Sequence, residues 1–277
     1  MIRWYADNSE LRGIWGAKIP DILLFGGVVI DDAAKSEICS VMRDVKSAYQ
    51  DNPVFPLKWN FRSLEKHYQE LRLSGLYSRL LEDSRAWRSD IFSRISSIDF
   101  KIIVSMIISY GSSRETLLRT RDQVIRFVFL MALQRVGLCV RNQGSRPAEI
   151  VLDWPAERQR KLFDLEYKSA YQNGTSADYN QGYACGPLKN LGFGESALFT
   201  STNECSVLQL SDLIVGATRE MIEEALGKKE NSLGVSLLAL IKDKFDGAPD
   251  NILGWGLAIS PRQGEFFEKV RDKISAL

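Results

Sequence analysis

The sequence predicts an α/β fold, in which a mixed β-sheet is flanked by helices and carries a helical insertion at about residues 50–97. Two apolar runs at the start, "IRWYAD" and "DILLFGGVVI", have the composition of adjacent strands. Segments typical of strands and of helices then alternate along the chain. The 277 residues are 45% hydrophobic and 26% charged, which fits a globular domain. We therefore expect a single domain over residues 1–277, with a C-terminal helical extension at about 220–277.

The first third of the chain is expected to form a hairpin followed by helices. The first strand should end in the turn-prone cluster Asp7-Asn8-Ser9. The second should run antiparallel to it, and its Gly26-Gly27 pair indicates a bulge or a close approach of another backbone. Residues 33–49 fit a helix, "DNPVFPLKWN" fits a loop fixed by two prolines, and residues 61–97 fit a mostly helical, basic stretch.

The later strands alternate with helices. "DFKIIVSMIIS" fits a buried strand, and residues 113–137 fit a long helix. "AEIVLDW" fits a buried strand that ends in Asp153, with a helix to about residue 172 starting near Pro155. "ALFTST" fits a last buried strand, which leads into a helix that contains Asp212. The glycine-rich segments "NGTSADYNQGYACGP" and "LGFGES" fit loops.

Composition narrows the class of protein and its location. The net charge of +1 neither favours nor excludes nucleic acid as a partner. Four scattered cysteines without a C-x-x-C pair argue against a zinc framework or a disulfide scaffold and favour a cytoplasmic location. The longest apolar run, "FKIIVSMIISY", is about half of a membrane span, so we expect no membrane partner. The single histidine, His67, excludes multi-histidine metal sites.

The segment "STNECSVLQLSDLIVGA" places a carboxylate inside an apolar helix. After its polar start the segment is apolar almost all round, as a buried helix is. Asp212 lies in its middle, where an isolated carboxylate loses water and gains little in return. A bound cation would compensate this charge. The alternative is a helix whose exposed stripe passes through Asp212.

Three aspartates occupy equivalent places in the predicted fold. Asp7 and Asp153 end strands, and Asp212 lies early in a helix that follows a strand. Ligands of open α/β sheets gather at the carboxyl ends of strands. Converging carboxylates would repel one another and protonate, whereas Mg²⁺ or Mn²⁺ would neutralise them. Two such ions about 4 Å apart support phosphodiester cleavage, so we interpret the three aspartates as catalytic metal ligands.

Each acidic residue also has a structural interpretation. Asp7 fits the start of an Asp-Asn-Ser turn, and Asp153 fits the N-cap of the helix near Pro155. Glu204 is a candidate fourth metal ligand, but Ser201 and Glu204 also match an S-x-x-E capping box.

Several of these segments resemble the family called domain of unknown function 3800. "YADNSE" resembles its opening motif and "IVLDW" its middle strand, while Gln209 and Asp212 match its closing motif over a region of roughly residues 2–220. Lys58 in "PLKWN" is also similar. The resemblance implies an RNase H-like fold and a metal-dependent nuclease, often associated with mobile elements and anti-phage defence. Lys58 would then neutralise the scissile phosphate or hold an acid, although it also fits a solvated loop.

The chain departs from the family at Asn8, where an acid is usual, at Glu10, where glycine is usual, and at Ser211, where alanine is commoner. Asn8 motivates an alternative function, a catalytically decayed nucleic-acid-binding or complex-forming module of a defence system. A third hypothesis is an assembly subunit with an apolar surface, based on Trp4, Trp15, Trp255 and "LGWGLAIS".

An arginine-rich stretch is the candidate surface for RNA or DNA. Arginine mixed with aromatic residues suits phosphate contacts and base stacking, although such runs also form solvated helix faces. The residues predicted to contact nucleic acid are Arg114, Arg119, Arg121 and Arg126. Because a toxic nuclease needs restraint, we also expect a protein partner that controls its activity.

Overall fold

The computed structural model describes residues 1–11, 21–51, 54–108, 120–144, 146–155, 157–179 and 181–277. Within these ranges the strands form one mixed sheet in the order β5-β4-β1-β2-β3-β6. The strands are β1 (Ile2–Leu11), β2 (Ile22–Ile30), β3 (Lys101–Ile108), β4 (Ala148–Asp153), β5 (Leu198–Thr200) and β6 (Leu257–Ser260). β2 is antiparallel to β1 and β3, whereas β4 is parallel to β1 and β5, and β6 to β3. The predicted α/β class with a mixed sheet is confirmed.

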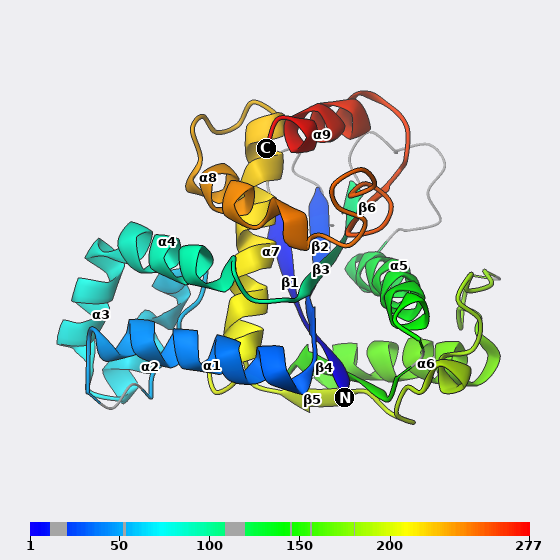
Figure 1. Ribbon diagram of the computed structural model, residues 1–277, viewed down its shortest axis with the longest axis horizontal. Helices are drawn as coiled ribbons and strands as arrows, with labels where there is room; N and C mark the ends of the chain where they lie inside the picture. The colour runs from blue at the N-terminus through cyan, green and yellow to red at the C-terminus, as the bar shows by residue number, and fades with distance from the viewer. Residues whose placement is uncertain (12–20, 52–53, 109–119, 145, 156, 180) are drawn as a thin grey trace.

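Helices cover both faces of the sheet (Figure 1). On one face lie α1 (Asp32–Ser47), α4 (Ser84–Ile95), α7 (Ser206–Ala225), α8 (Leu233–Leu240) and α9 (Glu265–Ser275), and on the other lie α5 (Arg121–Asn142) and α6 (Glu157–Asn173). Because side chains alternate along a strand, Tyr5 faces the α7 side and Trp4 the α5 side. Each face therefore has its own apolar core.

From Phe61 to Ile95 the chain between β2 and β3 is mostly helical, as predicted for residues 61–97. It contains the 3₁₀ turn η1 (Phe61–Leu64), α2 (Glu65–Glu70), α3 (Ser74–Glu82) and α4. Tyr68, Leu80 and Trp87 from these helices are buried in the same core as α7. The insertion is therefore packed onto the sheet domain.

The first strand differs from its prediction. β1 continues to Leu11, so Asp7 lies mid-strand and does not begin a turn. Pairing with β2 extends without interruption from Arg3↔Ile30 to Leu11↔Ile22. This pairing provides hydrogen-bond partners for the backbone on both sides of Asp7. A turn there would lose those hydrogen bonds, so the pairing outweighs the turn propensity of the residues that follow Asp7.

The glycine pair in β2 serves close packing and forms no bulge. A Cβ atom on Gly27 would lie 2.6 Å from the Oγ atom of Ser211, on α7. Only a residue without a side chain allows α7 to approach the strand this closely. The predicted close approach is confirmed, and it sets the position of the residues that follow Ser211.

The C-terminal extension is only partly helical. β6 pairs with β3 in parallel from Val104↔Leu257 onward, and the 3₁₀ turn η3 (Lys242–Lys244) separates α8 from it. The sequence prediction missed β6 because a run this short, with only three apolar residues, forms a strand only where a sheet edge is available. Trp4 and Leu257 are buried and Trp255 is partly buried against the core, so these residues do not form an exposed apolar surface; Trp15 lies outside the described residues.

Two further elements differ from expectation. β5 has only three residues and is partly exposed at the sheet edge, whereas a buried strand was predicted. α5 begins at Arg121 and continues to Asn142, and the first part of the predicted helix falls outside the described residues. The irregular segment before β5 contains the 3₁₀ turn η2 (Leu188–Leu191). By length and composition α5 could cross a membrane, but 72% of that stretch is buried within the protein.

Candidate active site

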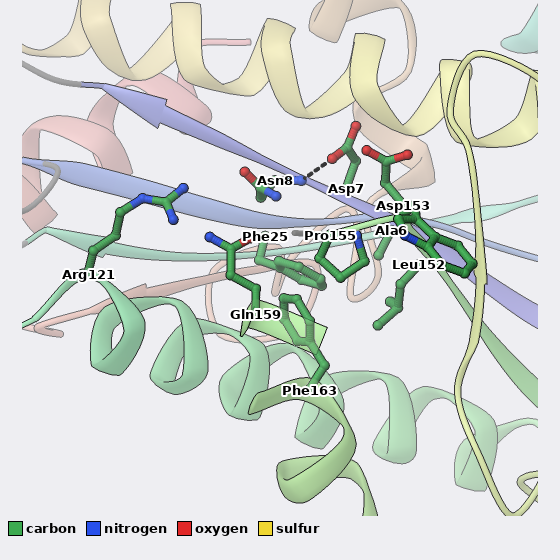
Figure 2. Close-up of a pocket in the computed structure, with 11 residues that line it drawn as sticks. Ala6, Asp7, Asn8, Phe25, Arg121, Leu152, Asp153, Pro155, Gln159 and Phe163 are labelled. Atoms are coloured by element: carbon green, nitrogen blue, oxygen red, sulfur yellow. Dashed lines mark hydrogen bonds between the residues drawn. The ribbon is translucent and has the colours of Figure 1, made fainter. Parts of the chain in front are cut away.

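Asp7 and Asp153 lie side by side on neighbouring parallel strands. The register of β1 and β4 pairs Ala6 with Leu152, and one further step sets Asp7 beside Asp153. Because side chains alternate along a strand, Asp7 and Asp153 lie on the same face of the sheet as Tyr5 and Val151, which belong to the core under α7. Figure 2 shows the two carboxylates on the same side of the sheet, pointing toward one another. The sheet alone therefore brings together two residues that are distant in sequence.

Helix α7 carries the third acid to the same place. The hydroxyl of Ser211 donates to the carbonyl oxygen of Tyr5 at 2.8 Å, which fixes α7 against β1. Asp212 is the next residue, and its carboxylate accepts a hydrogen bond from the backbone N–H of Trp59. The charges of Asp153 and Asp212 both act on Asp7. The three aspartates thus share one neighbourhood, as the sequence predicted.

The site is electrostatically costly for carboxylates. Asp7 is 7% exposed, and its burial raises its pKa well above the ordinary range, with further increases from Asp212 and Asp153. The N–H of Asn8, 2.7 Å from Oδ1 of Asp7, lowers that pKa, as does Lys58. Burial also raises the pKa of Asp212, against the opposing effects of Trp59 and Lys58. Nearby positive charge would favour the ionised form of these acids.

Lys58 reaches the site because the segment around it is bound to α7. The N–H of Leu57 donates to Oε1 of Gln209 at 3.2 Å, and the N–H of Trp59 donates to Asp212. The amide of Gln209 in turn donates to the carbonyl oxygen of Asn203 at 3.0 Å. Lys58 lies between the two bound residues, and its charge lowers the pKa of both Asp7 and Asp212.

Packing of Trp59 holds this segment in place. A Cβ atom on Gly216 would lie 2.1 Å from Cγ of Trp59, so the indole lies directly on the helix backbone. Arg88 lies over the rings of Trp59 and Trp87 at 4.9 and 4.4 Å and donates to the carbonyl oxygen of Trp59 at 2.6 Å. Burial lowers the pKa of Arg88 to about 10. Sequence reasoning missed this role of Arg88; the available signal was Gly216, a glycine within an apolar helix.

Two pockets open beside the carboxylates. The first, of about 220 Å³, is drawn in Figure 2 and is lined by Ala6, Asp7, Asn8, Phe25, Arg121, Leu152, Asp153, Trp154, Pro155, Gln159 and Phe163. The second, of about 270 Å³, is lined by Asn8, Ser9, Glu10, Trp59, Asn60, Arg121, Asp212, Gly216 and Arg219. Asn8 and Arg121 line both. The aspartates therefore border space that a substrate can enter.

Glu204 is not brought to the aspartates. It is exposed in the turn before α7 and lines neither pocket. The capping box is also wrong, because α7 begins only at Ser206 and its N-cap residue, Cys205, makes no side-chain cap. The turn has a different role, since the N–H of Thr202 donates to Oδ1 of Asp153 at 2.7 Å. α6 begins only at Glu157, so Asp153 is not its N-cap.

The predicted nucleic-acid contacts divide into three groups. Arg121 is the first residue of α5, lines both pockets and pairs with Glu10. Arg126 is buried, where it binds Glu166 at 3.2 Å and also pairs with Asp178. We therefore withdraw Arg126 from the predicted nucleic-acid surface, because its guanidinium is occupied inside the protein. Arg114 and Arg119 lie outside the described residues.

The donor atoms suit a hard divalent cation. Carboxylate oxygens are the ligands that Mg²⁺ and Mn²⁺ prefer. Within the described part of the chain, no three acidic, histidine or cysteine side chains come close enough to form a closed metal-binding group. Mg²⁺ is commonly held by only one or two carboxylates, together with waters and substrate phosphates. The aspartates therefore fit an ion whose remaining coordination positions are filled by water and by the substrate.

No protein-family model matches this chain, and comparison with curated proteins and with solved structures finds no match either. A functional assignment therefore depends on the chemistry of the site.

Proposed function

We propose that this protein is a metal-dependent nuclease of the RNase H-like class, which hydrolyses phosphodiester bonds of RNA or DNA with Mg²⁺ or Mn²⁺. The observation that carries the proposal is the neighbourhood that the aspartates share on the α7 side of the sheet, where Asp7 lies beside Asp153 and the charge of Asp212 acts on Asp7. The resemblance to the domain of unknown function 3800 family agrees with it. A role in anti-phage defence or in a mobile element is part of the same proposal.

The arrangement of the sheet supports the RNase H-like assignment. Asp7 and Asp153 are contributed by parallel neighbours, β1 and β4, and the helix that follows β5 contributes Asp212. This is the convergence that the resemblance implies for its three aspartates. Lys58, which the resemblance also singles out, lies within electrostatic reach of two of them.

The negative charge of the three aspartates supports a bound metal ion. Asp7 is nearly inaccessible to water, and two further carboxylates act on it. Burying a carboxylate without a partner is costly, and the raised pKa of Asp7 expresses that cost. Oxygen-liganded dications would remove the repulsion.

Each residue has a distinct role in the proposed reaction. A bound pair of ions would supply an activated water and stabilise the leaving oxygen. Asp7, Asp153 and Asp212 would hold those ions. Lys58 opposes the rise in the pKa of Asp7 and Asp212 and would add positive charge for the scissile phosphate. Arg121 and Arg219 border the second pocket, where they would attract the phosphate backbone.

A cleavage assay tests the proposal. Labelled RNA and DNA, single-stranded and duplex, are incubated with the protein in Mg²⁺, Mn²⁺ or EDTA. We expect cleavage with either metal and none in EDTA, and at least a hundredfold loss in each of the variants Asp7→Asn, Asp153→Asn and Asp212→Asn. Asp44→Asn, on an exposed part of α1, is the matched control and should cleave normally. Full activity of Asp212→Asn would refute the proposal.

A second candidate is a nucleic-acid-binding module with a decayed site. Asn8 favours it, because a neutral amide follows Asp7 and lines both pockets where the resembling family has an acid. This candidate predicts salt-sensitive binding that survives EDTA, without turnover in either metal.

A further inference from the structure

An exposed tryptophan adjoins the carboxylates. Trp154 directly follows Asp153 and is 58% exposed, whereas Trp4 and Trp87 are each 1% exposed. Its backbone is fixed, since its N–H donates to the carbonyl oxygen of Thr200 at 2.9 Å. Trp154 therefore presents its indole to solvent from a rigid position at the end of β4. An exposed aromatic side chain is significant when it belongs to a contiguous apolar patch, because such patches mark interaction sites.

The indole belongs to a cluster assembled from three elements. Phe199, on β5, meets it edge to face with ring centroids 6.3 Å apart. Arg160, on α6, lies 5.5 Å from the Trp154 ring and 5.3 Å from the Phe199 ring. Arg160 is 47% exposed and also contacts Asp164 at 3.7 Å. The result is an aromatic surface with a guanidinium on it, a combination that stacks bases and attracts phosphates.

Trp154 also lines the first pocket together with Asp7 and Asp153. The opposite side of that pocket is apolar and aromatic, with Phe25 and Phe163 labelled in Figure 2. The side-chain amides of Asn8 and Gln159 add hydrogen-bond donors and acceptors. A volume of about 220 Å³ is below the usual range for drug-sized ligands and suits a single flat ring system.

We propose that this aromatic pocket binds one unpaired base of a single-stranded nucleic acid and thereby sets the adjoining phosphate at the carboxylates. The proposal rests on the proposed nuclease function for the fate of that phosphate. Bases in a duplex are stacked and paired, so their faces are covered, whereas a single strand offers both the faces and the pairing edges. A neutral base also suits a pocket bordered by acids better than a second phosphate does.

Binding experiments on the full chain test the base site. Fluorescence anisotropy is measured with labelled oligo-dT, oligo-U and a blunt hairpin duplex, in Ca²⁺ and in EDTA. We expect tighter binding of the single strands than of the duplex, and a loss of about tenfold in single-strand affinity for Trp154→Ala. Trp154→Phe should retain most of the affinity, because a ring that can stack remains. Leu165→Ala, which removes an exposed side chain of α6, is the matched control.

The outcomes separate this proposal from the nuclease proposal. Unchanged single-strand affinity in Trp154→Ala, or equal binding of the duplex, overturns the base site even if the protein cleaves nucleic acid. Conversely, single-strand binding that depends on Trp154 but is followed by no metal-dependent cleavage upholds the base site and refutes the nuclease. An unchanged melting temperature of Trp154→Ala would exclude misfolding as the cause of lost affinity.

Discussion

The backbone N–H of Trp59 donates a hydrogen bond to the carboxylate of Asp212, joining two residues that are 153 positions apart. The bond lowers the pKa of that carboxylate and positions Lys58 beside it. The segment before η1 is therefore part of the site, although it lies in neither a helix nor a strand of the sheet. The position of this segment depends on its packing against α7, so a substitution that disturbs the packing should also disturb the site.

Enlarging Gly216 should damage both stability and activity. In Gly216→Ala the added Cβ atom would meet the Trp59 ring, and overpacking of this kind costs about 1–3 kcal/mol. The displaced segment would also withdraw the N–H from Asp212. Gly75→Ala is the matched control: nothing lies near its Cβ position in α3, so we expect unchanged or slightly higher stability. Urea unfolding of both variants checks this, and equal behaviour would contradict the packing account.

The metal-free protein should carry a pH-dependent cost at Asp7. Because the pKa of Asp7 is raised on folding, the folded state binds its proton more tightly than the unfolded state. The contribution of Asp7 to stability therefore falls as pH rises from the ordinary aspartate pKa, about 4, through the raised value. Asp7→Asn removes this dependence. In EDTA, the melting temperature of the variant should overtake that of the wild type with rising pH; parallel curves would refute the raised pKa.

Divalent cations should stabilise the folded protein through the aspartates. A ligand that binds only the folded state adds about 2.7 kcal/mol at a concentration one hundred times its Kd. We expect Mn²⁺ to raise the melting temperature of the wild type by several degrees, and to raise that of Asp7→Asn much less. Glu204→Gln is the control, since Glu204 is exposed and away from the pockets, and it should respond as the wild type does. Loss of the response in Glu204→Gln would restore Glu204 as a ligand.

Removing the charge of Lys58 should shift the pH dependence of cleavage. Lys58 lowers the pKa of Asp7 and Asp212, so in Lys58→Met both should titrate at higher pH. The acid limb of the pH–rate profile would then move upward, with a fall in rate of about ten- to hundredfold at neutral pH. Lys58→Arg should restore part of the rate. A reduced rate with an unmoved acid limb would assign Lys58 to substrate binding alone.

The two described arginines of the predicted surface should behave differently. Arg126→Ala leaves Glu166, which is fully buried, without its cation, and breaking a buried ion pair costs about 3–5 kcal/mol. Arg121→Ala should cost little stability, because the Arg121 side chain is 32% exposed, but should weaken nucleic-acid binding. Thermal unfolding combined with anisotropy on the folded proteins checks both. Weaker binding in folded Arg126→Ala would return Arg126 to the interface.

Much of the candidate site could be predicted from local patterns. Asp153 at the end of a buried strand and Asp212 within an apolar helix follow from hydrophobic periodicity, which acts over neighbouring residues. The Gly26-Gly27 pair likewise indicated a close approach, and the side chain of Ser211 packs against Gly27. Such features are determined by the sequence itself, because the residues that cause them lie within one helix or strand.

Features that depend on contacts between distant segments could be seen only in the tertiary structure. β1 runs past Asp7 because β2 offers it partners, and β6 exists because β3 has an open edge. Arg126 is buried because Glu166 and Asp178 bind it, although its sequence context fits a surface. Lys58 lies near the acids because Gln209 and Asp212 bind the backbone on either side of it. A side chain's partners, and therefore its charge state and accessibility, are set by which surfaces fold together.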